Sequence, residues 1–183
     1  MKEDKSQLMS YAMYAGLYLG VFWVIKHFIT TAMGHFSGLN VLASFLSVGT
    51  PLILYFFLTK YKTKITGNAM GFWHGVQFGI MLFFFASILE AMAVFIHVTW
   101  IDTAYIPDLY QNMLETAKTF NFNDSLLSAL EDSPTPSVAN YIFSNVIMAD
   151  VFLGFILSLL IVPIVIRYTP VNNSNTQPNN NIE

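Results

Sequence analysis

The residues most able to do chemistry are three charged side chains inside otherwise apolar stretches: Lys26, Glu90 and Asp150. A charge in the hydrocarbon core of a bilayer costs about 2.5–3.5 kcal/mol on insertion scales. Three isolated charges would together cost roughly 10 kcal/mol, as much as the stability of a whole domain. We therefore expect these side chains to pair, to reach water or to lose their charge.

One lysine facing two carboxylates leaves one negative charge uncompensated, so we hypothesise that Glu90 and Asp150 share a proton. Three interpretations stay open: ion pairs that hold helices together, a proton- or ion-coupled site, and an interfacial position with Lys26 extended toward the headgroups. His27 and His97 lie near the same region and could join the acids as metal ligands. The spacing contains no motif such as H-x-x-x-H, however, so we predict no metal site.

Four long apolar runs must position these residues: 8–30, 39–58, 71–98 and 141–166. Each has the roughly 20 residues that a helix needs to cross a bilayer, and none alternates like a barrel strand. Only 10% of the residues are charged, against about 25% in soluble domains. We predict an all-α integral membrane four-helix bundle over residues 1–168, followed by a disordered cytoplasmic tail over 169–183.

Basic residues indicate the orientation of the bundle. They precede the first run, link the second to the third, and follow the fourth: Lys2, Lys5, Lys60, Lys62, Lys64 and Arg167. All lie on one side if both termini are cytoplasmic. The loop over residues 99–138, with six acidic residues and the single cation Lys118, then lies outside.

Small residues recur at helical spacing, beginning with Gly67, Gly71, Gly75 and Gly79 at every fourth position. In lipid, such residues let helix backbones approach closely. We predict this role, within the bundle or in a homodimer, for a set of glycines from three runs: Gly16, Gly20, Gly71, Gly75, Gly79 and Gly154.

The third run carries its small-residue face onward to Glu90 and His97. Gly79, Ala86, Glu90 and His97 are separated by 7, 4 and 7 residues, which keeps them within a few tens of degrees on a helix. In the other runs, Asp150 lies four residues from a glycine, and Lys26 shares a broad face with small residues. We therefore predict an intramembrane charge cluster of Lys26, Glu90, Asp150 and His97, with its three charged residues roughly 4–8 Å from the midplane.

The acidic loop contains two stretches with helical apolar spacing, "YIPDLYQNMLETAKTF" and "NDSLLSALED". We expect one or two amphipathic helices that lie on the outer membrane surface or cap the bundle. Such helices could serve only for packing, or they could offer a docking or ligand surface.

The link "LTKYKTKITGNAMGFWHGVQFGI", the acidic loop beginning "WIDTAYIPDLYQNMLE" and the last apolar run together resemble the bacterial membrane family called domain of unknown function 4199. The resemblance covers residues from about 8 to 168. It implies a four-span inner-membrane protein of Gram-negative bacteria, with no assigned activity and so no catalytic residue to carry over. Members are often encoded near a polyprenyl-phosphate glycosyltransferase, which implies an accessory role in envelope lipid-linked sugar handling.

The function classes follow from what the sequence lacks. It has no nucleophile elbow, phosphate-binding loop, H-E-x-x-H motif or basic nucleic-acid patch, so we predict no catalytic residue, cofactor or nucleic-acid partner. Our first hypothesis is a non-enzymatic accessory or scaffold subunit that contacts the bilayer and a membrane-protein partner or its own copies. The alternative is a small oligomeric proton- or ion-coupled transporter using Glu90 and Asp150. A lipid-acting enzyme with Glu90, Asp150 and His97 as acid–base groups comes third.

Overall fold

The computed structural model describes residues 5–33, 40–120, 124–132 and 134–168, and these residues form helices joined by short turns, without a strand among them. The α-helices are α1 (Lys5–Met33), α2 (Asn40–Lys60), α3 (Phe72–Ile96), α4 (Tyr105–Thr119), α5 (Asp124–Glu131), α6 (Val138–Tyr141) and α7 (Ala149–Tyr168). Three π-helical segments extend them: η2 (Tyr61–Ile65) after α2, η3 (His97–Ile101) after α3, and η4 (Ile142–Met148) between α6 and α7. The predicted all-α fold is confirmed.

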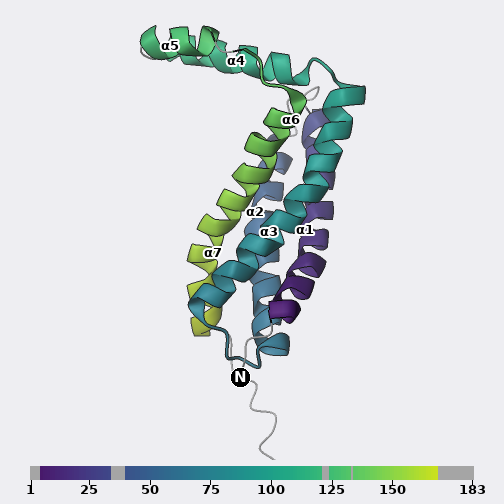
Figure 1. Ribbon diagram of the computed structural model, residues 1–183, viewed down its shortest axis with the longest axis vertical. Coiled ribbons are helices and arrows are strands. Elements are labelled where there is room, and N and C mark those ends of the chain that lie inside the picture. The colour runs from purple at the N-terminus through teal and green to yellow at the C-terminus, as the bar shows by residue number, and fades with distance from the viewer. Residues whose placement is uncertain (1–4, 34–39, 121–123, 133, 169–183) are drawn as a thin grey trace, which may run out of the picture.

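The long helices α1, α2, α3 and α7 run side by side, and α4 and α5 project crosswise from one end of this bundle (Figure 1). Three continuous segments are long and apolar enough to cross a membrane: Gln7–Thr31, Phe72–Ile101 and Val138–Arg167. They indicate a membrane protein. The predicted span over 39–58 begins one residue outside the described part of the chain. The whole of the predicted tail over 169–183 also lies outside it.

Helix α3 is the centre of the bundle, with α1 on one side and α7 on the other. Glycines of α1 allow the first contact, because a Cβ atom at Gly16 would lie 2.6 Å from Cβ of Phe85 and one at Gly20 would lie 2.9 Å from Cβ of Leu89. The resulting core includes fully buried side chains from all four long helices: Leu19, Leu54, Phe78, Leu82, Phe83 and Val162.

Glycines also bring α3 and α7 together. A Cβ atom at Gly75 would lie 2.8 Å from Val162, one at Gly79 would overlap the hydroxyl of Ser158, and one at Gly154 would press into the ring of Phe83. Gly71 makes no such helix contact within the described bundle. Gly71 caps the N-terminus of α3, and nothing lies within 4 Å of where its Cβ atom would be.

Gly67, the first glycine of the predicted stripe, belongs to the turn that leads from η2 to α3. Its φ is +56°, a left-handed conformation that glycine adopts without the steric cost of a side chain. The helical stripe in α3 thus starts at Gly75, because the chain at Gly67 and Gly71 is not yet a helix.

Two exposed tryptophans mark the ends of the central span. Trp73 is 66% exposed and Trp100 is 73% exposed. They are 27 residues apart, or about 40 Å at 1.5 Å per residue, which matches the roughly 40–45 Å thickness of a bilayer with its headgroups. Tryptophan favours this interface. By contrast, Trp23 is buried and donates a hydrogen bond to Thr50 over 3.0 Å.

Candidate functional site

The candidate site lies in the half of the bundle nearest α4, where α1, α3 and α7 carry the three charged residues. The carboxyl groups of Glu90 and Asp150 are hydrogen-bonding partners, and the charge of Lys26 acts on both. A hydrogen bond between two carboxyl groups needs one proton, because a carboxylate has no donor. All three residues are half-buried by protein. We call Lys26, Glu90 and Asp150 the charged cluster.

The π-helical segment η4 adds a tyrosine to this cluster. Tyr141 and Asp150 are nine residues apart, which would place them about 180° apart on a regular α-helix. The segment between them is η4, and its wider i→i+5 turns advance by a smaller angle per residue. Both side chains therefore interact with Glu90. Asp150 forms a hydrogen bond with it, and Tyr141 interacts with it electrostatically.

A second polar contact links α1, η3 and α4 at the end of the bundle. Nε2 of His27 lies 3.3 Å from Nδ1 of His97, a hydrogen-bonding distance in which one ring donates. The ring of His97 also packs edge-on against Tyr105, whose hydroxyl is a hydrogen-bonding partner of Tyr141. His97 was predicted to belong to the charge cluster. Its contacts are with His27 and Tyr105, and Tyr105 and Tyr141 link it to Glu90.

The polar side chains of this region include groups that can exchange protons. Oδ2 of Asp150 is buried and has no hydrogen-bond partner within the described parts of the chain. In those same parts, no three His, Asp or Glu side chains are grouped as metal ligands. The groups that remain available are exchangeable protons on carboxyl, imidazole and phenol side chains.

Two cavities flank the α4 end of the bundle, and neither is lined by the charged cluster. One of about 600 Å³ lies between α4 and the segment before α6, against Tyr110, Leu114 and Pro136. The other, of about 480 Å³, is an apolar groove between α3 and the start of the last span, against Met92, Phe95 and Phe143. The acids therefore do not open into either of these two cavities.

Helices α4 and α5, together called the arm here, form the second candidate site. Ile106 at the start of α4 is buried in a small core with Val98 of η3 and Tyr141 of α6. Farther out, Lys118 of α4 and Glu131 of α5 form an ion pair of 2.7 Å. The two helices contain four acidic residues, Asp108, Glu115, Asp124 and Glu131, against Lys118 alone, so the arm carries a net negative charge.

Two polar contacts at the opposite end of the bundle were not predicted from the sequence. Lys62 was interpreted as a topology signal, but it is 4% exposed and its ammonium donates to the carbonyls of Val165 and Ile166 over 3.2 and 3.0 Å. It thereby satisfies carbonyls in the last turn of α7. Nearby, the hydroxyl of Tyr61 lies 2.7 Å from Nε2 of His74. No spacing rule could pair Lys62 with backbone atoms more than 100 residues away.

Comparison with known proteins gives one result. The model of the family described as "Protein of unknown function (DUF4199)" matches residues 14–166. No curated protein and no solved structure matches the chain. Since the family match covers most of the 183 residues, and agrees with the resemblance carried by the lysine-bearing link and the acidic loop, the chain belongs to the DUF4199 family.

Proposed function

We propose that the protein is a four-span inner-membrane protein of bacteria, with α2 as the remaining span and both termini in the cytoplasm. Two features support this topology. The start of α1, the link at η2 and the end of α7 lie at the same end of the bundle, and the arm lies at the other (Figure 1). The lysines of the link belong to the first of these ends, which is the cytoplasmic end under the positive-inside rule.

Within this topology, the protein acts as a non-enzymatic accessory subunit that recruits a partner protein through the arm. The single observation that carries this proposal is the arm itself, an amphipathic hairpin held crosswise at the bundle end (Figure 1). Asp108 and Glu115 lie on its polar face, about 180° from the buried Ile106 at 100° per residue. A surface of one charge sign steers a complementary partner, so the partner is expected to present a basic patch.

Gentle extraction of the tagged protein from its own membrane tests this role. The wild-type chain should bring down one companion in stoichiometric amount, and Asp108→Asn combined with Glu115→Gln should reduce its recovery at least several-fold. Asn112→Gln, an uncharged change on the same polar face, should leave recovery unchanged. Recovery of the protein without any companion, or equal recovery with all three chains, would contradict the proposal.

A second function is favoured by the charged cluster: proton- or ion-coupled transport. Glu90 lies 17 residues after Trp73 and ten before Trp100, so the cluster is within the membrane and close to its middle. One four-helix bundle has little room for an aqueous path, so several copies would have to surround one. A purified oligomer that takes up or releases protons near neutral pH, with the signal lost in Glu90→Gln, would favour transport over the subunit role.

A further inference from the structure

We propose that α4 lies on the bilayer surface and inserts its apolar face among the lipid headgroups and upper acyl chains. The inference concerns the side of the arm opposite its acidic face and does not depend on the partner protein proposed above. It rests on which way the apolar face of α4 points, on the level at which α4 leaves the bundle, and on the side chains that protein leaves uncovered.

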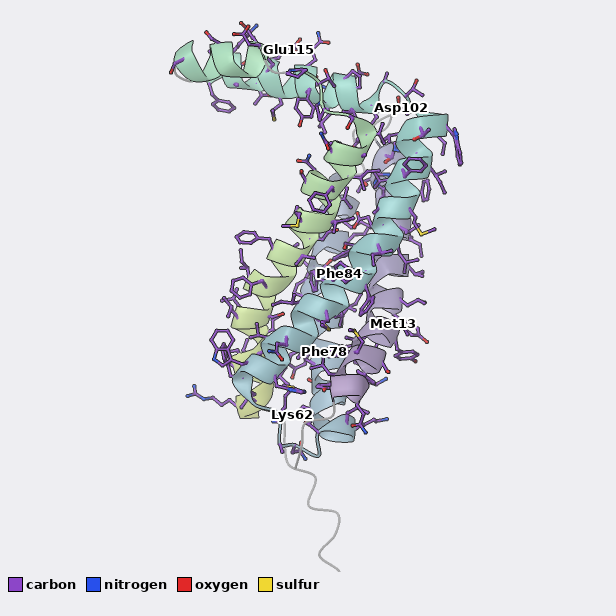
Figure 2. The ribbon with its side chains drawn as sticks, viewed as in Figure 1. Met13, Lys62, Phe78, Phe84, Asp102 and Glu115 are labelled. Atoms are coloured by element: carbon purple, nitrogen blue, oxygen red, sulfur yellow. The ribbon has the colours of Figure 1, made fainter. Side chains whose placement is uncertain are left out.

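The direction of the apolar face is set by Ile106. This side chain is buried against Val98 of the central span, so its face of α4 is turned toward the bundle. Met113 and Phe120 lie 7 and 14 residues farther along, within about 40° of Ile106 at 100° per residue. Glu115 falls on the opposite side, and Figure 2 shows it on the edge of the arm that is turned away from the bundle.

The bundle covers only the first part of this face. The arm extends sideways beyond the helices (Figure 1), and there Met113 is 46% exposed and Phe120 is 72% exposed. Leu109, on the same side of α4, is also exposed. Three large apolar side chains on this side of α4 are thus left largely exposed by the described protein, although Met113 also borders the cavity between α4 and the segment before α6.

The level of the arm matches the membrane interface. Trp100, which marks the headgroup region at this end of the central span, is followed after four residues by the start of α4. A helix that begins at this level and turns its apolar face toward the spans meets lipid, as interfacial amphipathic helices do. Since the arm is acidic, the attraction comes from apolar area and not from anionic headgroups.

Fluorescence quenching at single cysteines tests the placement. The native chain has no cysteine, so Met113→Cys, Glu115→Cys and Leu17→Cys can each carry one environment-sensitive fluorophore in the full-length protein. Each would be placed in phosphatidylcholine nanodiscs that hold one copy. Leu17 is an exposed residue of the α1 span and serves as the reference for contact with lipid.

The label at position 113 should be quenched several-fold more by spin-labelled lipid than the label at position 115, and iodide in the water should quench in the reverse order. High salt should not change this pattern, because screening acts on charges and not on apolar contact. Equal quenching of both labels by iodide would show that the arm stands off the bilayer. Protection of position 113 from both quenchers would show that protein covers this face. Either outcome overturns the proposal, and Leu109→Cys provides the same test if Met113→Cys is not recovered folded.

Discussion

The two ends of the bundle differ in whether their buried polar side chains have hydrogen-bond partners. At the η2 end, Lys62 and Tyr61 are buried with partners, the first on the carbonyls of α7 and the second on His74. Tyr61 also stacks on Phe78 with ring centroids 4.5 Å apart. At the α4 end, two acids share a site and Oδ2 of Asp150 has no partner within the described chain. Figure 2 shows Lys62 and Asp102 at the two ends.

The contrast distinguishes polar groups that hold helices together from polar groups whose hydrogen bonds are incomplete. A buried polar group with its hydrogen bonds made holds helices in place at little net cost, whereas an unsatisfied one costs about 1–3 kcal/mol. Charged residues inside a membrane mark functional sites by default. We therefore interpret the η2 end and the glycine contacts as the structural scaffold. We interpret the α4 end, with its charged cluster and arm, as the region that carries the proposed function.

The largest expected effect is at the scaffold, at Gly79. Gly79→Leu places a side chain where the hydroxyl of Ser158 already lies, so α3 and α7 must separate. We expect a cost above the roughly 1–3 kcal/mol of ordinary overpacking, seen as loss of monodisperse protein or a large fall in melting temperature in detergent. Gly71→Leu is the matched control, because open space surrounds that position. Equal tolerance of both changes would show that the glycines are not a helix contact.

The next effect is at the charged cluster. Lys26→Met leaves two acids in the membrane without their cation and should destabilise the protein, though by less than the roughly 3–5 kcal/mol of a fully buried pair, because Lys26 is half-buried. Glu90→Gln or Asp150→Asn should partly rescue it. Thermal unfolding of the single and double variants gives the coupling, expected at about 0.5–3 kcal/mol. Strictly additive losses would mean that the lysine does not interact with the acids.

A smaller effect is expected at Lys62. Lys62→Met removes the donor to two carbonyls of α7 and should cost about 1.5–3 kcal/mol, the range for hydrogen bonds to a charged group. Lys64→Met, two residues on and exposed, should have almost no effect on the melting temperature. If both lysines behave alike, their shared contribution is charge near the membrane surface and not the cap on α7.

The sequence alone predicted the features that depend on local pattern. Apolar length identified the spans that include α1, α3 and α7, and helical spacing placed helices at α4 and α5. It did not predict where the glycine stripe starts, because Gly67 and Gly71 have helical spacing but belong to a turn and a helix cap.

Contacts between distant segments could be predicted only where each side had its own signal. Glu90 and Asp150 were expected to meet because each lies on a small-residue face, and their carboxyl groups are partners. The contact between His27 and His97 has no such signal. The reach of Tyr141 to Glu90 depends on the π-helical turns of η4, which the helical wheel of a regular α-helix does not anticipate.

Cysteine accessibility tests whether the two ends of the bundle lie on opposite sides of one membrane, with the arm outside. Ser125 in α5 and Thr63 in η2 are both exposed, and the chain has no native cysteine. In spheroplasts, an impermeant maleimide should label Ser125→Cys and leave Thr63→Cys unlabelled, while permeabilised cells should label both. Labelling of Thr63→Cys alone would reverse the orientation, and labelling of both in intact spheroplasts would contradict the separation of the two ends.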